Sequence, residues 1–362
     1  METTLKDLFF NPKFYKTLSA EIKKVHSSFP ENTFYKDSVD GIKNLSLNQR
    51  MRQTSVTLKK YLPTDYKKSL AIMFRVIPEI NGSYANLVFP DFVSQYGHNH
   101  FEASMEALHF FTQYGSSEFA IREFLKRDFQ KTLAVMKNWA GDKNHHVRRL
   151  ASEGSRPRLP WSFKLDEVVK NPKHTLPILE KLKTDEELYV RKSVANHLND
   201  FSKDHPALLI DTLKNWNLDN QHTAWIVKHA CRTLIKKGDS KALSIFAFEK
   251  NTKVSIQKFK LESANIKIGK TLEFSFQVVS EKNKSQKLAI DFTIYYRKKL
   301  GELSPKVFKL KELTLGPGET ISIRKTHRLQ DFTTRKHYPG THKLVITING
   351  KSLAEKKFEL LK

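Results

Sequence analysis

Residues 147–153 carry the pattern that decides the fold, and they read Val147-Arg148-Arg149-Leu150-Ala151-Ser152-Glu153. The pattern returns 43 residues later as Val190-Arg191-Lys192-Ser193-Val194-Ala195-Asn196, and a weaker copy follows 36 residues after that as Ile226-Val227-Lys228-His229-Ala230-Cys231-Arg232. Apolar residues three and four positions apart predict helices. Paired helices that repeat every ~36–47 residues are typical of HEAT-like or armadillo-like solenoids. The spacing therefore predicts a mainly α solenoid of HEAT-like helical repeats over residues 1–250.

The second part of the chain, residues 251–362, has a different period. Thr271-Leu272-Glu273-Phe274-Ser275-Phe276-Gln277-Val278 alternates strictly between polar and apolar residues, and residues 288–296 and 343–348 do the same. Alternation of this kind predicts half-buried β-strands, and turn residues such as Asn349-Gly350 separate the strands. About seven strands in such a length are typical of an all-β immunoglobulin-like sandwich.

The charge of the chain narrows the choice of partner. The formal net charge is +25 in 362 residues, and proteins this basic usually meet nucleic acid, an anionic membrane or an acidic partner. Residues 251–362 are the more densely basic part, because they hold 24 Lys and Arg against 10 Asp and Glu. This density favours a sandwich that contacts a polyanion as a clamp, and the alternatives are a solubility surface or a docking module for another acidic macromolecule.

Three absences in the sequence exclude other classes of protein. Cys231 is the single cysteine, so an intrachain disulfide and a cysteine-rich metal site are both excluded. No apolar run reaches the ~18 residues of a membrane span, and the N-terminus lacks the apolar core of a signal peptide. We therefore expect a cytoplasmic, intracellular protein with no membrane partner, and no obligate protein partner is evident.

The first copy of the repeat continues into a segment with an unusual mixture of side chains. Residues 147–161 contain four arginines, one carboxylate and Trp161. Arg149 and Glu153 are four positions apart and so share one helical face, and a glycine and two prolines then end the helix and stiffen the following loop. The mixture predicts a basic surface with one acid in its middle and a rigid aromatic beyond it. Such a surface suits a protein that grips a polyanion and does chemistry on it.

Residues 147–161, 190–200 and 225–230 closely resemble the HEAT-like-repeat alkylpurine DNA glycosylases. The AlkC branch fits better than the AlkD branch, since some AlkC-type members carry a C-terminal immunoglobulin-like domain. The resemblance covers nearly the whole chain. It implies a base-excision-repair enzyme that removes N-alkylated, cationic bases such as 3-methyladenine and 3-methylcytosine from double-stranded DNA. It also implies hydrolysis of the N-glycosidic bond without base flipping and without a cofactor.

The resemblance also implies roles for individual residues. Glu153 matches the family's catalytic acid position, Glu118 a second active-site carboxylate, and Trp161 the aromatic beside the lesion. Arg149 matches an arginine that grips the DNA backbone, and the family pattern extends more loosely to Asp200, Asn196 and Arg158.

The chemistry of the reaction agrees with these roles. An alkylated ring nitrogen makes the base cationic, so the base leaves as a neutral molecule without a general acid. Carboxylates in a partly dry cleft stabilise the oxocarbenium-like sugar and orient or deprotonate the attacking water. An aromatic face stabilises a cationic base.

Each of these residues also has a purely structural interpretation. Glu153 and Arg149 are compatible with an ordinary surface ion pair. Glu118 follows two serines and is a residue type that the helix dipole favours at a helix start, and Trp161 is compatible with core packing. His145 and His146 are adjacent and do not share a helical face, so we expect no metal site there.

The repeat register predicts two rows of side chains along one face of the solenoid. Arg149, Lys192 and Lys228 occupy one row, and a cationic row suits a phosphate backbone. Glu153, Asn196 and Arg232 occupy the second row. The expected DNA-binding residues are Arg149, Arg156, Arg158, Lys192, Asn196, Lys228 and Arg232. The expected clamp contacts in the sandwich are Lys282, Lys284, Arg297, Lys298, Lys299, Arg324, Lys325, Arg335 and Lys336.

Two functions of other classes stay open at this point. A non-catalytic HEAT-repeat scaffold that binds nucleic acid or an acidic protein would have the same basic repeats, and its carboxylates would be dispensable. A glycosylase-like fold that recognises bulky or branched DNA would bind DNA without releasing a base.

Overall fold

The computed structural model describes residues 4–362 except 82, 247, 249–251 and 333–335. The chain divides into two compact units, one made of residues up to 205 with 216–230, the other made of residues 206–215 with 231–362. We call them the helical unit and the sandwich unit. Among the described residues, no helix is both long enough and apolar enough to cross a membrane.

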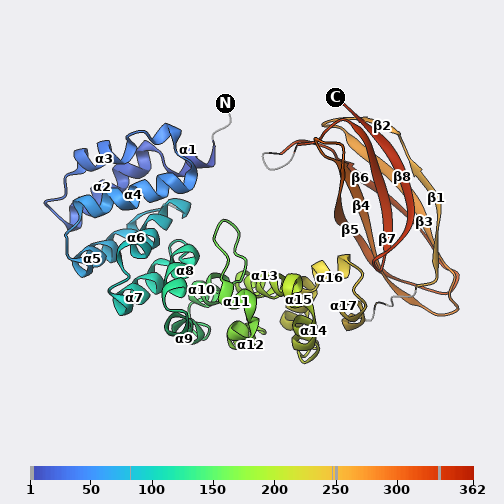
Figure 1. The fold of residues 1–362 in the computed structure, drawn as a ribbon, viewed down its shortest axis with the longest axis horizontal. Helices are drawn as coiled ribbons and strands as arrows, with labels where there is room; N and C mark the ends of the chain where they lie inside the picture. Colours follow the sequence, from blue (N-terminus) through green and yellow to red (C-terminus); the bar gives the residue numbers. More distant parts are fainter. Residues whose placement is uncertain (1–3, 82, 247, 249–251, 333–335) are drawn as a thin grey trace. The chain divides into compact units, whose positions relative to one another are not determined.

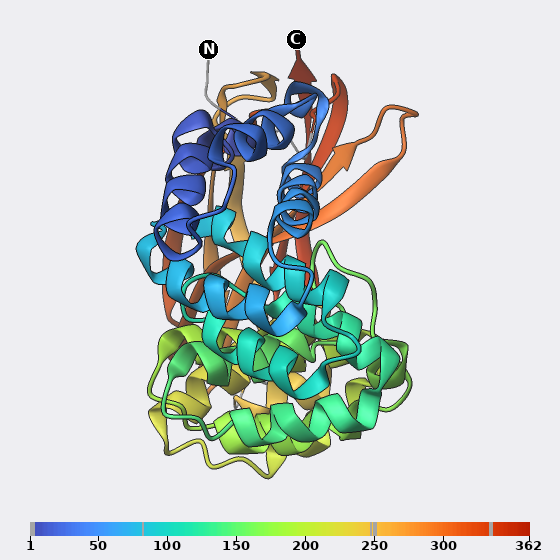
Figure 2. The same ribbon diagram turned by 90° about the vertical axis from the view of Figure 1, so that its left-hand side faces the viewer.

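The helical unit consists of helices stacked one upon the next (Figures 1 and 2). Three of them, α10, α13 and α15, contain copies of the sequence repeat, and α8, α10, α13 and α15 are neighbours in this order. With α4 and α6 they form one layer, and α2, α5, α7, α9 and α12 pack behind it. The described α-helices of this unit are α1 (Leu5–Phe9), α2 (Pro12–Val25), α3 (Glu31–Val39), α4 (Leu47–Tyr61), α5 (Tyr66–Val76), α6 (Val88–Tyr96), α7 (Phe101–Phe111), α8 (Glu118–Arg127), α9 (Phe129–Trp139), α10 (His145–Gly154), α11 (Asp166–Lys170), α12 (Leu176–Leu182), α13 (Leu188–Asp204) and α15 (Gln221–Ala230).

Short 3-10 turns connect several of these helices, namely η1 (Ile42–Asn44), η2 (Ile77–Glu79), η3 (Ser83–Leu87) and η4 (Pro172–Thr175). The apolar positions that define the repeat are fully buried, as Val147, Leu150, Val190, Val194 and Ile226 show. The predicted HEAT-like solenoid is therefore confirmed for this unit.

The start and end of α10 are encoded locally. Asn144 caps the helix, because its side-chain oxygen accepts a hydrogen bond of 2.9 Å from the backbone N–H of His146. At the other end, a Cβ on Gly154 would lie 2.5 Å from Cγ2 of Ile121 on α8. Glycine at this position therefore permits a close approach of α8 and α10, the two helices that carry the expected carboxylates.

The sandwich unit contains two sheets in its described part. Strands β1 (Val254–Leu261), β3 (Thr271–Ser280) and β6 (Thr320–Arg328) form a three-stranded sheet, in the order β1-β3-β6. The five-stranded sheet has the order β2-β8-β7-β4-β5, and its strands are β2 (Asn265–Lys267), β4 (Gln286–Arg297), β5 (Leu303–Leu315), β7 (Gly340–Ile348) and β8 (Lys351–Leu361). Every pairing is antiparallel except the parallel contact of β2 with β8.

The predicted immunoglobulin-like sandwich is confirmed, with two differences. Eight strands are present among the described residues where the sequence predicts about seven, because three-residue β2 is too short to show an alternating pattern. Residues of β4 are buried almost continuously rather than alternately. The physical reason is a second contact on the outer side of β4, where Ala289 packs against Leu243 and Phe248.

Three helices belong to the sandwich unit, namely α14 (Pro206–Lys214), α16 (Arg232–Lys236) and α17 (Ser240–Ile245). Gly238 lies against Gly350, so closely that a Cβ on Gly238 would be 2.9 Å from Cα of Gly350. The amino group of Lys236 donates to the carbonyl of Val307 over 3.4 Å. The predicted domain division at residue 250 stays a prediction, but these contacts tie helices before residue 250 to the strands after it.

Candidate active site

Three carboxylates that are distant in sequence meet in the helical unit. Glu118 is the first residue of α8, Glu153 lies in the last turn of α10, and Asp200 lies on α13. Their side chains are only 14%, 8% and 5% exposed, respectively. Carboxylates this deeply buried are uncommon unless they are paired. We call these three residues the carboxylate cluster.

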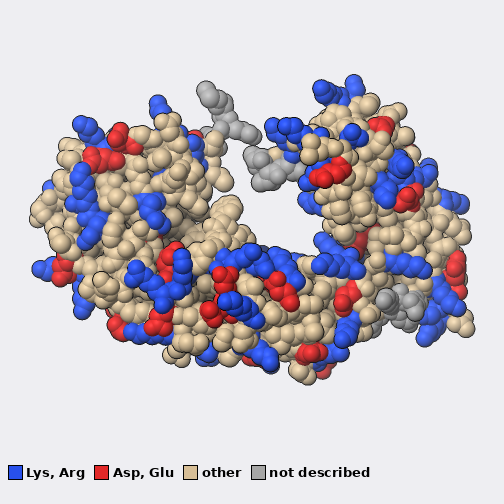
Figure 3. Space-filling model, in the orientation of Figure 1, with Lys and Arg blue, Asp and Glu red and all other residues tan. Residues whose placement is uncertain are grey.

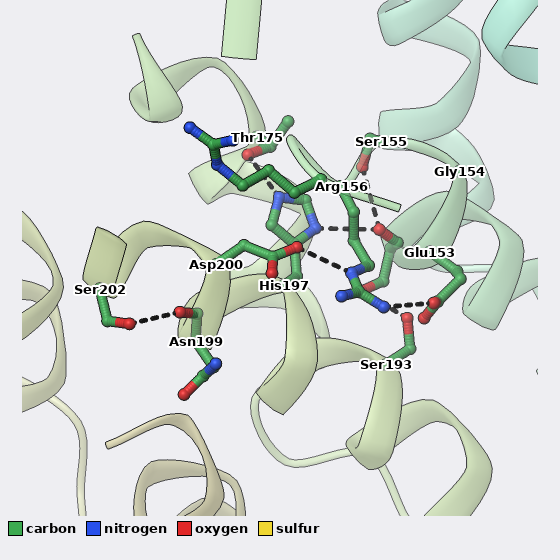
Figure 4. Close-up of polar contacts among 12 residues, drawn as sticks. Glu153, Gly154, Ser155, Arg156, Thr175, Ser193, His197, Asn199, Asp200 and Ser202 are labelled. Carbon is green, nitrogen blue, oxygen red and sulfur yellow. Dashed lines mark hydrogen bonds and ion pairs between the residues drawn. The ribbon is translucent and has the colours of Figure 1, made fainter. Parts of the chain in front are cut away.

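Two arginines connect the members of the carboxylate cluster. Arg149 contacts the carboxylate of Glu118, donates to Oγ of Ser116 over 2.6 Å, and lies 3.8 Å from Oε1 of Glu153. Arg156 donates from Nη1 to Oε1 of Glu153 over 2.6 Å and from Nε to Oδ2 of Asp200 over 3.0 Å. Figure 4 shows the guanidinium of Arg156 between these two carboxylates.

The environment of the cluster sets its charge. Burial raises the pKa of Glu118 above its ordinary value, and Arg149 beside it offsets part of that rise. Burial likewise raises the pKa of Asp200, with Arg156 offsetting part of it. The three carboxylates outnumber the two arginines that pair with them. The buried guanidinium of Arg122 on α8 adds a third positive charge that acts on Glu153 and Asp200, so these charges interact in a place that water screens poorly.

The prediction that Arg149 and Arg156 form part of an exposed basic surface is wrong. Their side chains are 12% and 8% exposed, because carboxylates of neighbouring helices cover and pair with them. The ion pair of Arg149 with Glu153 exists, but it is buried and is not a surface pair. A DNA-binding role for these two arginines stays a prediction, and the geometry gives them a different task, which is to hold the carboxylates in place.

Trp161 projects into solvent from the loop between α10 and α11. It is 73% exposed, so the alternative interpretation as a core residue is wrong. Its backbone φ is 64°, in the left-handed region that a bulky residue rarely adopts. A strained, exposed aromatic is held by its surroundings and is typical of functional loops.

A cavity of about 330 Å³ adjoins Trp161. Its walls come from α4, α6, α8 and the Trp161 loop, and Ser116, the partner of Arg149, is one of its lining residues. Arg52 and the buried carboxylate of Asp91 form a bidentate ion pair at its edge. The remaining lining residues are Asn48, Gln49, Met51, Leu87, Pro90, Ser94, Phe119, Ala120, Glu123, Ser162 and Phe163.

Sequence reasoning missed two side chains that belong to this region. Tyr189 is 43% exposed, and the guanidinium of Arg149 lies 5.0 Å from its ring centre. Tyr189 precedes the second repeat copy just as His146 precedes the first, and the two rings are 5.8 Å apart. An alignment of the repeat copies that started one residue earlier would have paired Tyr189 with His146 and so could have identified Tyr189. Arg122 is the second missed residue, and no sequence signal marks it, because arginine on a helix ordinarily predicts exposure.

A buried histidine contacts the backbone next to the carboxylate cluster. The ring of His197 on α13 is fully buried, with Nδ1 2.9 Å from the carbonyl oxygen of Ser152 and Nε2 3.1 Å from Oγ1 of Thr175 (Figure 4). Because a carbonyl only accepts hydrogen bonds, Nδ1 carries the proton of a neutral ring. Burial lowers the pKa of His197 to about 3. This ring ties α13 to the helix turn that precedes Glu153.

The remaining expected DNA-binding residues occupy more open positions. Lys192 on α13 and Lys228 on α15 are exposed, and Asn196 is partly buried. Arg158 pairs with Asp204 over 2.8 Å. Figure 3 shows basic side chains gathered over the region of α10, α13 and α15.

The last member of the second predicted row lies at a helix boundary. Helix α15 ends at Ala230 and Arg232 begins α16, so the alignment of Arg232 with Glu153 and Asn196 stays a prediction. Glu118 at the start of α8 agrees with both of its interpretations, since it has the helix position that a dipole favours and also contacts Arg149. Among the residues that the structure describes, no group of three His, Cys, Asp or Glu side chains could hold a metal ion.

Comparisons with known proteins place this arrangement in a family. A model described as DNA alkylation repair enzyme matches residues 112–234, which include the carboxylate cluster. A second model, described as the C-terminal Ig-like domain of the uncharacterised protein YhaZ, matches residues 255–362. The helical unit thus resembles enzymes of DNA alkylation repair, and the sandwich unit resembles the C-terminal Ig-like domain of YhaZ.

Two whole-chain relatives narrow the class. The uncharacterized protein YhaZ of Bacillus subtilis (strain 168) is 43% identical over 347 residues, which are 96% of each chain. The solved structure of Pseudomonas fluorescens alkylpurine DNA glycosylase AlkC, bound to DNA containing an abasic site analogue, is 44% identical. It superimposes with a TM-score of 0.96 over 99% of this chain and 100% of that chain. The chain therefore belongs to the AlkC family of alkylpurine DNA glycosylases.

Proposed function

We propose that this protein is a DNA glycosylase that hydrolyses the N-glycosidic bond of N-alkylated bases in double-stranded DNA. The observation that carries the proposal is the buried carboxylate cluster together with the exposed Trp161. Membership of a family whose solved member is an alkylpurine DNA glycosylase supports the same substrate class.

The charge of the substrate explains why this site suits the reaction. An N-alkylated base is cationic and leaves as a neutral molecule, so no acid has to protonate it. Positive charge then develops on the sugar, and Glu118, Glu153 and Asp200 supply negative charge that water screens little. The paired arginines fix the carboxylates before the reaction, so little reorganisation is needed in the transition state. Glu153 and Glu118 also orient the attacking water or remove its proton.

Trp161 acts on the base and the sugar rather than on the water. Its exposed indole offers an aromatic face that stabilises a cationic base and an electron-poor sugar. Because the carboxylates are buried and Trp161 projects into solvent, we propose that the indole contacts a lesion that stays in the duplex and is not flipped into a pocket. The preferred substrates are 3-methyladenine and 3-methylcytosine, and the protein acts in the cytoplasm at the nucleoid.

Release of a methylated base is the direct test. Purified protein is expected to release 3-methyladenine from methylated duplex DNA faster than the spontaneous rate, both with and without EDTA. The matched control is Glu153→Gln. This variant is expected to bind DNA containing an abasic site analogue as the wild-type protein does, and to lose most of the base release. Spontaneous rates for adenine and cytosine adducts alike would refute the proposal.

A non-catalytic nucleic-acid-binding scaffold is the alternative, and one observation favours it. Each member of the carboxylate cluster already pairs with an arginine, as expected of a purely structural network. The scaffold predicts that DNA binding is retained while no base is released. The same release assay, run beside a binding measurement, separates the two functions.

We also propose that the sandwich unit adds non-specific affinity for DNA as a clamp. Lys298 and Lys299 are exposed in the turn between β4 and β5, and Arg324 and Lys325 are exposed on β6. Lys282 is partly buried, and Lys284, Arg297 and Lys336 are exposed. The ninth expected contact, Arg335, lies outside the described residues.

The clamp is best tested with the full chain, because truncation at residue 251 would expose Leu243 and Phe248, which pack against Ala289. The double variant Lys298→Ala, Lys299→Ala is expected to lower the salt dependence of DNA affinity by about two phosphate contacts. An unchanged slope of log Kd against log salt for this variant, and for Arg324→Ala, Lys325→Ala, would exclude the clamp.

A further inference from the structure

We infer that Arg122 is a positioning residue that holds the Trp161 loop and the end of α10 in the geometry that excision requires. Arg122 lies on α8, one helical turn after Glu118. Its side chain is fully buried, and it is the largest fully buried side chain among the described residues. The inference rests on the proposed glycosylase function, because it assigns Arg122 a role in that reaction.

The contacts of Arg122 fasten both ends of one loop. Its Nη1 donates to the carbonyl oxygen of Gly154 over 3.1 Å and to that of Arg156 over 2.6 Å. Its Nη2 donates to the carbonyl oxygen of Phe163, and the guanidinium carbon lies 5.2 Å from the centre of the Phe163 ring. Trp161 lies between these two anchored ends. One side chain on α8 therefore joins the beginning of the loop to its end.

The loop depends on this anchor because Trp161 itself contributes little to holding it. A residue that is 73% exposed buries little surface, and a φ of 64° is unfavourable for a tryptophan backbone. The loop also has two backbone hydrogen bonds of its own, from Leu165 to Pro157 over 3.1 Å and from Ser162 to Leu159 over 3.2 Å, and the ion pair of Arg158 with Asp204 on α13. They shape the turn but do not attach it to α8.

Arg122 also connects the aromatic with the carboxylates. Gly154 follows Glu153 directly, and Arg156 is the arginine that Glu153 and Asp200 share. By binding the carbonyls of Gly154 and Arg156, Arg122 fixes the backbone from which these two site residues project. Glu118, the remaining member of the carboxylate cluster, lies on the same helix as Arg122.

The chemistry of the guanidinium explains why arginine is needed. No ion pair of Arg122 is found in the described part of the chain, and its hydrogen-bond partners are three carbonyl oxygens. Three carbonyls in different directions suit a planar fork of five donors, whereas an ammonium group is a point charge on a flexible stem. Burial lowers the pKa of Arg122 to about 10, so the group still carries its charge at neutral pH.

The test compares Arg122→Lys and Arg122→Ala with the control Arg127→Lys, an exposed arginine on the same helix. For Arg122→Lys we expect kcat for base release to fall about 10²-fold, as for a reacting group displaced by about 1 Å. The Kd for DNA with an abasic site analogue is expected to change by less than about threefold, because phosphate contacts are untouched. Guanidinium ion added to Arg122→Ala is expected to restore part of kcat, whereas the same concentration of sodium chloride is not.

A second readout reports the loop without relying on activity. The chain has four tryptophans, so protein labelled with 5-fluorotryptophan gives four fluorine resonances, and Trp161→Phe identifies one of them. In Arg122→Lys the Trp161 resonance is expected to shift or broaden, while those of the buried Trp139 and Trp216 stay in place. If Arg122→Ala does not fold, Arg122→Lys decides the question alone.

Three outcomes would overturn the inference. The first is a wild-type kcat for Arg122→Lys, and the second is a Trp161 resonance that is unchanged in this variant. The third is a parallel shift of all four resonances with equal losses of binding and excision, which would mean that Arg122 only stabilises the fold. If the wild-type protein releases no base, the proposed function fails, and the fluorine spectra still report whether Arg122 holds the loop.

Discussion

Replacement of Glu153 by glutamine tests the central electrostatic claim. The substitution keeps the size of the side chain and an oxygen acceptor for Arg156, but it removes one negative charge. The variant cluster therefore keeps two of its three carboxylates and has one negative charge fewer with which to stabilise the sugar. The Glu153 side chain is 8% exposed, so solvent does not replace the lost charge.

The expected magnitude follows from Coulomb's law. A carboxylate about 5 Å from a developing unit charge, at an effective dielectric constant of about 20, contributes about 3 kcal/mol. This free energy corresponds to a rate loss of about 10²-fold. Stability should fall by less, about 1.5–3 kcal/mol for one charged hydrogen bond, because Arg156 retains Asp200 at 3.0 Å.

The assay is single-turnover release of 3-methyladenine from duplex DNA at saturating enzyme. Fluorescence anisotropy with DNA containing an abasic site analogue measures binding in parallel. Glu167→Gln is the matched control, since Glu167 is an exposed carboxylate on α11 of the same unit, and it should behave as the wild-type protein does. A Glu153→Gln rate within about threefold of wild type, or a loss of binding equal to the loss of rate, would refute the electrostatic role.

Three further predictions concern neighbouring residues. Trp161→Gly relieves a positive φ, so the free energy of unfolding should stay unchanged or rise by up to about 1 kcal/mol. Base release should fall about 10-fold or more, because the aromatic face is lost. A lower melting temperature would contradict the exposed position of the indole. Lys192→Ala and Lys228→Ala should each reduce the salt slope of DNA binding by about 0.9 and leave kcat at saturating DNA unchanged, and a binding-neutral result would remove these lysines from the interface. His197 is buried as a neutral ring, so only the unfolded chain binds a proton at this residue as the pH falls below 6.5. The free energy of unfolding should therefore decrease between pH 6.5 and about 3. Urea titrations of His197→Gln should lack this part of the decrease.

The sequence predicts the architecture well because both periods are long and regular. Repeated apolar positions such as Val147, Val190 and Ile226 are all in the core, and their spacing alone indicates stacked helices. Glu153 lies on the same side of α10 as Arg149, as the spacing indicates, and Glu118 contacts the same arginine.

What the sequence does not reveal depends on contacts between repeats and on loop geometry. Arginine ordinarily indicates a solvent-exposed position, so the burial of Arg149 and Arg156 is visible only once carboxylates from three helices are placed around them. The pairing of Arg156 with Asp200 requires the turn after Gly154 to direct its side chain inward, and no periodicity encodes that turn. The continuous burial of β4 has a similar origin, because Phe248 and Leu243 cover its outer side from segments that precede the strands.

The carboxylate cluster has a consequence for how the helical unit comes apart. Repeats in a solenoid are usually stabilised by their immediate neighbours and can open in small steps. Here the ion pairs run from α8 through α10 to α13, so detachment of any one of these helices leaves a buried charge without its partner, at a cost of about 3–5 kcal/mol. The amides of the three helices should consequently exchange their hydrogens in one cooperative opening. The smallest piece of the solenoid that can open near the site is thus the whole of the segment that holds it.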